Sequence, residues 1–262
     1  MNSSPPEPDK SPAERAAVAV ALAFAFLTVI PTWPLSRKIS DQDVEASRFA
    51  FPLVGVVLGL VLAILSGLFE RSGIAPPVAA FLLVAATAAV TGGLHLDGLA
   101  DTADGLFLWG ESSRRLTVMR DPHVGSYGVT AVVLCVLGKF VALASLPGSV
   151  RGLGLFTALT VSRSLILVSA GRASYARAEG TGRLLINATT PSEALAAAAL
   201  ALLVASLTNH VAGLFATLVA LGITLGTTEL AKRRLGGVTG DILGALTELS
   251  EMSYLVSLSC FF

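Results

Sequence analysis

Long apolar runs recur along this chain and dominate any prediction of its fold. A helix needs about 20 apolar residues to cross a hydrocarbon core of ~30 Å, and eight runs approach that length. They cover approximately residues 16–30, 51–69, 77–94, 129–146, 153–170, 194–207, 211–227 and 243–262. The first and sixth are short and polar residues interrupt the eighth, so we expect seven or eight spanning helices. The runs are continuous and do not alternate with a period of two, which argues against a transmembrane barrel. The predicted fold class is all-α, a polytopic transmembrane helical bundle.

Composition excludes several classes of protein. Charged residues make up 14% of the chain, against about 25% in soluble domains, so the polar surface is too small for an ordinary cytosolic enzyme or a disordered protein. The 18 basic residues equal the 18 acidic ones, so no net positive field attracts nucleic acid. Cys135 and Cys260 lie in apolar runs and are expected to be buried hydrophobic residues, not a disulfide or a zinc site.

Charge also suggests the orientation in the membrane. Residues 1–15 contain four prolines and mixed charges, which predicts a disordered tail ahead of a single transmembrane domain over residues 16–262. Twelve of the 18 basic residues lie in four alternate loops, around residues 37–48, 114–120, 172–183 and 232–234. The positive-inside rule places these loops in the cytoplasm. The N-terminus is then outside if the short first segment spans, and inside if that segment lies in the interface.

The most informative stretch contains three aspartates at positions i, i+4 and i+7. On a helix, Asp97, Asp101 and Asp104 fall within about 60° of one another and repel. Such a stripe near a membrane needs a compensating positive charge, and no lysine or arginine lies between Arg71 and Arg114. A bound cation is the simplest partner, and oxygen ligands favour Mg²⁺, Mn²⁺ or Ca²⁺.

The alternative is a solvated helix face that needs no cation. The arrangement in one stripe favours the cation, as do Gly98 and Gly105, which let a backbone or a ligand approach closely. His95 precedes the stripe. We expect it to support the ligands and not to bind a hard metal ion itself.

A second acidic site follows a glycine-rich turn near the C-terminal end. Asp241 is expected at the start of the last helix, with Glu248 two turns further on the same face. The alternative is that Asp241 is only a helix N-cap, a common device after such a turn. The preceding basic run, residues 232–234, suits an anionic substrate.

Two cations fall inside predicted spans. Lys139 and Arg163 are costly there unless they snorkel or face a polar cavity. Arg163 lies in the middle of its segment, so we expect it to face the cavity. Lys139 is open to a second interpretation, in which it pairs with an acid elsewhere in the bundle.

Acids for divalent cations beside basic residues indicate a phosphorylated or pyrophosphorylated substrate. Phosphoryl transfer needs metal ions that bridge the phosphates, positive groups and an aligned nucleophile. Carboxylates from two helices are able to hold one or two metal ions, and a further carboxylate is able to accept a proton from an attacking hydroxyl. The sequence contains no P-loop, no Ser-His-Asp arrangement and no dinucleotide fingerprint.

Residues 92–105, GGLHLDGLADTADG, resemble the signature of the cobalamin synthase family, the adenosylcobinamide-GDP ribazoletransferases. Further resemblances follow in order along nearly the whole chain, apart from the tail and the final residues. They lie at residues 47–55, 119–128, 161–163, 175–182 and 235–241. Several independent motifs in the same order make the resemblance specific.

The resemblance implies an enzyme that joins adenosylcobinamide-GDP to α-ribazole or to α-ribazole 5′-phosphate. The products would be adenosylcobalamin, or its 5′-phosphate, and GMP, at the late nucleotide-loop step of cobalamin biosynthesis. It also implies a requirement for Mg²⁺, a multi-pass protein of the bacterial inner membrane, and an active site that faces the cytoplasm. Residues 16–262 would then be a single catalytic domain.

Residue roles follow from the same resemblance. Four aspartates would hold Mg²⁺ on the pyrophosphate, and one of them, Asp104 or Asp101, would accept the proton of the ribazole hydroxyl. The four are Asp97, Asp101, Asp104 and Asp241. Phosphates would be bound by Arg48, Arg120, Arg163 and Arg177, with Arg120 and Arg163 ranked first. His95 and Glu248 would support these residues.

The reaction also resembles that of CDP-alcohol phosphotransferases, which use the motifs D-x-x-D-G and G-x-x-x-D-x-x-x-D. Residues 101–105 fit the first motif, but Ala245 stands where the last acid of the second is required. A shared fold with that class is therefore only an analogy. Two other functions stay open: a different phosphotransferase of that type, which would release CMP, and a cation-coupled transporter. No inverted repeat is visible in the sequence to support the transporter.

Overall fold

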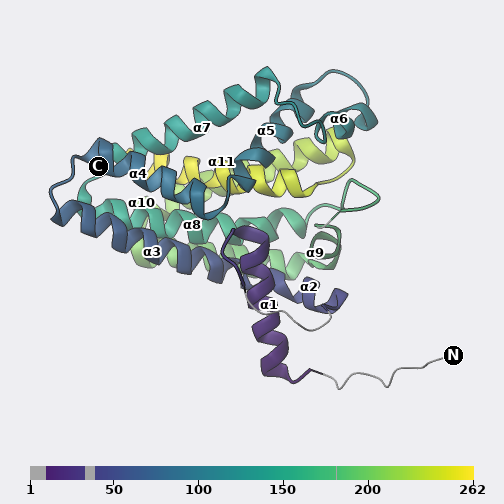
Figure 1. Cartoon of the computed structure of the whole chain (residues 1–262), viewed down its shortest axis with the longest axis horizontal. Coiled ribbons are helices and arrows are strands. Elements are labelled where there is room, and N and C mark those ends of the chain that lie inside the picture. Colours follow the sequence, from purple (N-terminus) through teal and green to yellow (C-terminus); the bar gives the residue numbers. More distant parts are fainter. Residues whose placement is uncertain (1–9, 33–38, 181) are drawn as a thin grey trace.

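The computed structural model describes residues 10–32, 39–180 and 182–262, and these form helices joined by short loops (Figure 1). The order is α1 (Pro12–Leu27), α2 (Asp41–Ser47), the 3₁₀ turn η1 (Arg48–Ala50), α3 (Phe51–Arg71), α4 (Pro76–Val90), α5 (Leu94–Phe107), α6 (Ser112–Val118), α7 (Ser126–Ser145), α8 (Gly148–Ala170), α9 (Arg183–Ala188), α10 (Pro191–Leu235) and α11 (Gly240–Ser259). The predicted all-α, polytopic helical fold is confirmed.

Helix α8 lies in the centre of the bundle, where α3, α10 and α11 pack against it. Its C-terminal half is buried on every side, as expected of a helix that is apolar or small all round. Helix α3 approaches it through Gly55 and Gly59, which are four residues apart. A Cβ atom at Gly55 would lie 2.5 Å from the carbonyl oxygen of Leu159, so only glycine permits this approach.

The structure has fewer clear spans than the sequence suggested. Four helical stretches are long and apolar enough to cross a membrane: residues 41–71, α7, α8 and α10. Helices α4 and α5 would give a fifth span if they were counted together. They are kept apart from the four because the chain bends by 86° between them, across residues 91–93. The difference from seven or eight has three causes. The first segment is short, polar residues interrupt α11, and the sixth and seventh runs are joined within α10.

Helix α10 is a hairpin of two helical halves, because the backbone leaves helical geometry at Asn209 and the residue after it. The first half begins at Pro191 after the N-cap Thr190, next to the C-terminal end of α8. Asn209, at the turn, donates a hydrogen bond to Thr157, nearer the start of α8. Thr228, in the second half, donates a hydrogen bond to Ser169 near the end of α8. The two halves therefore run antiparallel along α8, as two separate apolar runs predict.

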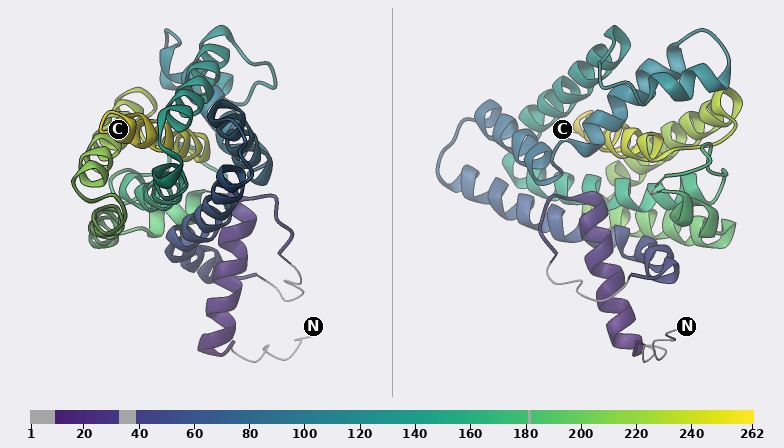
Figure 2. Two further views of the ribbon diagram at one scale, coloured as in Figure 1. Left: turned by 90° about the vertical axis from the view of Figure 1, so that its left-hand side faces the viewer. Right: turned by 45° about the vertical axis from the view of Figure 1, so that its right-hand side comes forward.

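Helix α1 begins at Pro12, because Ser11 and Glu14 form a capping box there. The predicted disordered tail therefore ends before residue 12, and its residues 1–9 lie outside the described residues. In all views, α1 runs at a steep angle to the long helices (Figures 1 and 2). Lys10 pairs with Asp43 of α2. The arrangement favours the interfacial alternative for the first segment.

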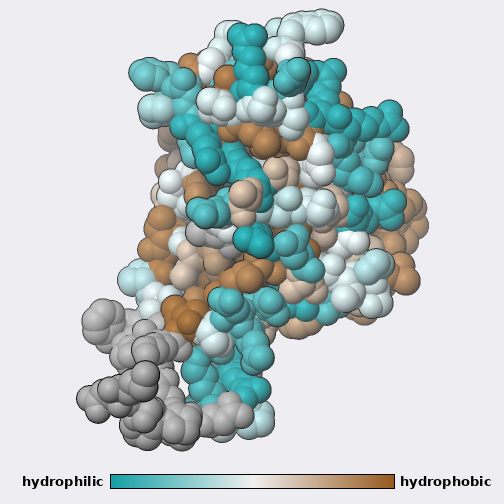
Figure 3. Space-filling model, turned by 90° about the vertical axis from the view of Figure 1, so that its right-hand side faces the viewer, coloured by the Kyte–Doolittle hydropathy of each residue, from teal (hydrophilic) through white to brown (hydrophobic). Residues whose placement is uncertain are grey.

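The basic loops gather at one end of the bundle. Helix α2 packs against α9, Arg48 pairs with Glu193 at the start of α10, and Ser112 of α6 donates to the carbonyl oxygen of Leu235. This end presents a largely hydrophilic surface with apolar areas between polar ones (Figure 3). Residues 37 and 38 of the first basic loop lie outside the described residues. The rest agrees with the predicted segregation of positive charge.

Candidate active site

The predicted acidic stripe lies on α5, which begins after Gly93, a residue with φ of 72°. Basic residues from the last turns of α6 and α10 hold the other end of this helix. Arg115 donates to the carbonyl oxygens of Gly105 and Leu106, at 3.2 and 2.6 Å, and Arg234 donates to Leu106 at 2.8 Å. Burial lowers the pKa of Arg115, and neighbouring Arg234 lowers it further. These arginines satisfy carbonyl groups that the helix end leaves unpaired, and so fix the stripe in place.

Helix α11 brings a fourth aspartate to the stripe. A Cβ atom at Gly98 would lie 2.8 Å from the carbonyl oxygen of Asp241, so this glycine lets α5 and α11 touch. The N-cap of α11 is Thr239, whose hydroxyl accepts a hydrogen bond of 3.3 Å from the Ile242 amide. The alternative that Asp241 is only the N-cap is therefore wrong.

The structure thus brings Asp97, Asp101, Asp104 and Asp241 together, and we call them the aspartate cluster. Asp101 is half-buried at its centre, and the other three carboxylates all act unfavourably on its charge. Arg177 acts in the opposite direction. Four carboxylates near one guanidinium form a site that attracts further positive charge.

The members of the aspartate cluster differ in how much they are already bound. Both oxygens of Asp104 accept backbone hydrogen bonds, from Gly125 at 2.7 Å and Gly128 at 2.9 Å. Asp104 therefore holds the loop before α7 and the first turn of that helix. Asp97 is exposed and Asp101 is half-buried. Both oxygens of Asp104 already accept backbone hydrogen bonds. Asp101 is therefore better placed than Asp104 to accept a proton.

Arg177 reaches the aspartate cluster from the loop after α8. This loop runs beside the turn before α11, where the Ala176 amide donates to Val238 at 2.8 Å and the Val238 amide donates to Ser174 at 2.9 Å. Arg177 then forms an ion pair of 2.8 Å with Asp241. Its Nε is buried and has no hydrogen-bond partner among the described residues. That donor suits an anionic oxygen of a substrate.

The donor set of the aspartate cluster fits a hard divalent cation in chemistry and charge, because every donor is a carboxylate oxygen. Within residues 10–32, 39–180 and 182–262, no group of three His, Cys, Asp or Glu side chains stands close enough to hold a metal ion. The prediction of Mg²⁺ therefore depends on the nature of the donors and on their uncompensated charge.

Two predicted phosphate-binding arginines lie at the same end of the bundle as the aspartate cluster. Arg120 is exposed and follows Met119, whose carbonyl oxygen lies 3.4 Å from Nη2 of Arg177. Arg48 is buried and pairs with Glu193 at 3.0 Å. Arg120 is therefore next to the site, whereas Arg48 joins the start of α3 to the start of α10.

Two further predicted residues, Arg163 and Glu248, belong to a buried ionic network and not to the aspartate cluster. Lys139 of α7 pairs with Glu248 at 2.7 Å and also with Glu251, and Arg163 of α8 pairs with Glu251. All four side chains are buried. The pairing interpretation of Lys139 is confirmed, and Arg163 is held by an acid in place of a polar cavity.

Sequence reasoning missed Glu251. The available signal was its spacing, because an acid three residues after Glu248 lies on the same side of a helix. Two cations inside spans also required two acids, and α11 supplies both.

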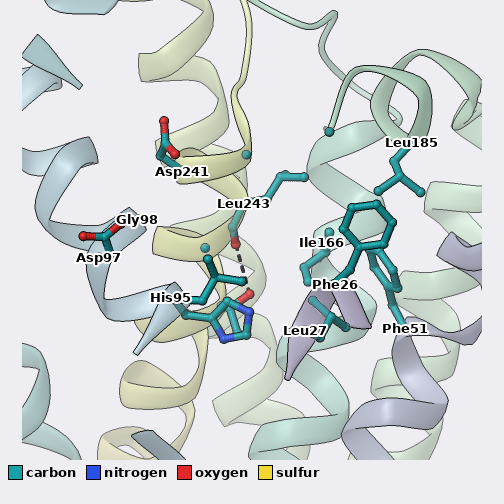
Figure 4. Close-up of a pocket in the computed structure, with 15 residues that line it drawn as sticks. Phe26, Leu27, Phe51, His95, Asp97, Gly98, Ile166, Leu185, Asp241 and Leu243 are labelled. Atoms are coloured by element: carbon teal, nitrogen blue, oxygen red, sulfur yellow. Dashed lines mark hydrogen bonds between the residues drawn. The ribbon is translucent and has the colours of Figure 1, made fainter. Parts of the chain in front are cut away.

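His95 is buried, and its Nδ1 has no hydrogen-bond partner within the described part of the chain. It lines a pocket with Asp97, Gly98 and Asp241 (Figure 4). The pocket therefore opens directly beside the aspartate cluster.

Comparison with known proteins agrees with these features. The family described as cobalamin-5-phosphate synthase matches residues 19–259. A protein named adenosylcobinamide-GDP ribazoletransferase from Acetivibrio thermocellus is 34% identical over 90% of this chain and 95% of its own. Proteins of the same name from Klebsiella pneumoniae and Geotalea daltonii are 35% and 37% identical, over 90% of this chain and 98% and 95% of theirs. No solved structure matches.

Proposed function

The chain belongs to the cobalamin-5-phosphate synthase family, and from this premise we propose that the aspartate cluster is its active site. The protein is a transferase of cobalamin biosynthesis that acts at the assembly of the nucleotide loop, an adenosylcobinamide-GDP ribazoletransferase. Its acceptor is α-ribazole or α-ribazole 5′-phosphate. The products are adenosylcobalamin, or its 5′-phosphate, and GMP.

One observation carries the assignment of the site: four carboxylates lie near enough to influence one another's charge where α5 touches α11, and Arg177 pairs with one of them. A pyrophosphate is strongly anionic, so carboxylates suit it only through cations between them. The aspartate cluster would hold Mg²⁺, which neutralises charge on the phosphate oxygens when bound. Nε of Arg177 donates to a phosphate oxygen, and exposed Arg120 supplies a further positive charge at the rim.

The proposed step is an in-line displacement at phosphorus. The hydroxyl oxygen of the ribazole forms a bond to the phosphorus attached to cobinamide, and the bridging P–O bond breaks. GMP leaves with the electron pair of that bond. The hydroxyl proton passes to Asp101, whose oxygens are less occupied than those of Asp104.

The protein has several helices suited to a membrane, and we assign it to the bacterial inner membrane. The aspartate cluster lies at the end of the bundle where the basic loops gather. The positive-inside rule makes that end cytoplasmic, which suits a large, water-soluble corrinoid substrate. The contact of Lys10 with Asp43 of α2, which lies at this end, supports a start of α1 on the same side.

Release of GMP tests the proposal. Purified protein in liposomes receives adenosylcobinamide-GDP, α-ribazole and Mg²⁺, with EDTA as one control and Asp101→Asn as another. We expect GMP and a cobalamin product together, only with Mg²⁺ and only with the intact aspartate cluster. Folded protein that releases CMP from a CDP-alcohol, and no GMP here, would show the alternative phosphotransferase. Undiminished turnover in Asp101→Asn would overturn the site.

A further inference from the structure

A pocket of about 170 Å³ lies next to the aspartate cluster and is enclosed by α1, α3, α5, α8, α9 and α11. Its two sides differ in chemistry (Figure 4). On one side, His95, Asp97 and Asp241 come from α5 and α11. On the other side, apolar side chains come from the remaining helices, and they include Phe26, Phe51 and Ile166.

We propose that this pocket binds the aromatic base of the ribazole nucleoside, with the sugar directed towards the aspartate cluster. The inference depends on the proposed function and extends it by naming the part of the protein that selects the acceptor. The base is a planar, bicyclic benzimidazole with two methyl groups and no exocyclic polar group. The sugar hydroxyl that attacks phosphorus must reach the carboxylates at the same time.

The size of the pocket fits this occupant. A cavity of about 150 Å³ lined by apolar side chains is known to hold a benzene ring, and this pocket is somewhat larger, at about 170 Å³. A corrin macrocycle is far too large for it. Aromatic side chains also suit a planar ring, because aromatic pairs gain stability beyond the area they bury.

The polarity of the pocket distinguishes the ribazole base from guanine. Guanine has several hydrogen-bonding groups along its edge, and burial without partners for them is unfavourable. Here Phe26, Phe51 and Ile166 offer none. A benzimidazole riboside has one unprotonated ring nitrogen, so it needs one polar partner in the pocket. Buried His95, whose Nδ1 has no partner among the described residues, is a polar group of the kind that this nitrogen needs.

The first test compares conservative variants of the apolar side with a matched exposed control. Phe26→Leu and Phe51→Leu remove aromatic surface from the pocket, and Phe81→Leu makes the same change at a side chain that is 62% exposed on α4. Removal of a small apolar contact from a hydrophobic pocket changes specificity roughly tenfold or more. We therefore expect KM for α-ribazole to rise by roughly tenfold or more in the first two variants. We expect KM for adenosylcobinamide-GDP to be unchanged in all three.

A second test uses the unaltered protein, so it does not depend on the folding of any variant. Acceptors that differ only in the base are compared: α-ribazole, the riboside of unmethylated benzimidazole, and the riboside of hypoxanthine. We expect kcat/KM to fall in that order, because the last base brings unpaired polar groups into the pocket. Binding of α-ribazole without the second substrate is followed by its benzimidazole fluorescence.

The outcomes separate the pocket from the proposed function. If the unaltered protein releases no GMP with any acceptor, the proposed function fails. If it is active but both phenylalanine variants keep the original KM for α-ribazole, the pocket assignment fails. A rise in KM for adenosylcobinamide-GDP alone would show that the pocket binds guanine and would overturn the inference. Equal use of hypoxanthine riboside would overturn it as well.

Discussion

Arg177 and Asp241 form an ion pair of 2.8 Å that joins the loop after α8 to the first turn of α11. Backbone hydrogen bonds position the pair, because residues 174–176 bond to residue 238 just before the two side chains meet. It brings a guanidinium to the four carboxylates of the aspartate cluster and leaves their excess negative charge largely uncompensated. That excess explains both the cation requirement we propose and the cost of holding the cluster together.

Asp101→Asn is expected to separate activity from stability. It removes a carboxylate proposed to hold Mg²⁺ and to accept the proton, so GMP release should fall by roughly 10²-fold or more. It also relieves repulsion from the other three carboxylates, so without Mg²⁺ its thermal midpoint should equal or exceed that of the unaltered protein. Asp121→Asn, at an exposed loop residue paired with His123, is the control. A much lower midpoint for Asp101→Asn would contradict this account.

Removal of Mg²⁺ should lower stability as well as activity. A cation bound between the carboxylates stabilises the folded protein by mass action, so the thermal midpoint should rise as Mg²⁺ is added. The rise should be smaller in Asp97→Asn and Asp241→Asn. Differential scanning fluorimetry in detergent measures this without any substrate. A midpoint that does not respond to Mg²⁺ would argue against a resident metal site.

Arg177→Lys should impair activity although the charge is kept. Lysine lacks the planar fork with which arginine binds a carboxylate and donates to a phosphate at the same time. We expect kcat/KM for adenosylcobinamide-GDP to fall roughly tenfold or more. Arg172→Lys, an exposed residue of the same loop, should behave like the unaltered protein. Equal losses in both variants would point to the loop as a whole and not to the ion pair.

Glu251→Gln should be strongly destabilising. It removes the carboxylate that pairs with both Arg163 and Lys139, and breaking a buried pair costs about 3–5 kcal/mol. Glu229→Gln breaks exposed pairs with Lys232 and Arg233 and should change the free energy of unfolding far less, because water screens exposed ion pairs. Unfolding by a denaturing detergent gives both free energies. Similar losses in the two variants would show that the buried network contributes little.

His210→Gly should stabilise the protein. His210 has φ of 50° and ψ of −132° in the turn between the halves of α10, and such a backbone in a non-glycine residue costs about 1–3 kcal/mol. Asn209→Gly is the matched control, because Asn209 has an ordinary φ of −124° and donates to Thr157 and Tyr254. Its free energy of unfolding should fall. A fall in His210→Gly would contradict the assignment of strain.

Local patterns predicted which helices carry the four aspartates, because such patterns depend on neighbours along the chain. The spacing of Asp97, Asp101 and Asp104 required a helix with one acidic face, and α5 is that helix. The glycine-rich turn predicted that Asp241 begins a helix. The sequence did not reveal that Thr239 is the cap, since threonine and aspartate are both good N-cap residues.

Features that depend on distant residues were less predictable. The apolar run at residues 77–94 looks like one span, yet the chain bends by 86° between α4 and α5. Glycine at positions 92 and 93 permits the bend, but the run alone does not require it. Arg163 was expected at a polar cavity because nothing local supplied its partner, and Glu251 lies 88 residues further along the chain.

The buried network also has a consequence for how the protein is made. Lys139 and Arg163 leave the ribosome well before Glu248 and Glu251, which follow on α11. Until α11 arrives, α7 and α8 carry two unneutralised cations inside the bundle, and an assembly intermediate at that stage is at its least stable. Insertion of α11 then supplies both missing charges and, at its other end, Asp241. Neutralisation of the buried cations and completion of the aspartate cluster thus depend on the same late helix.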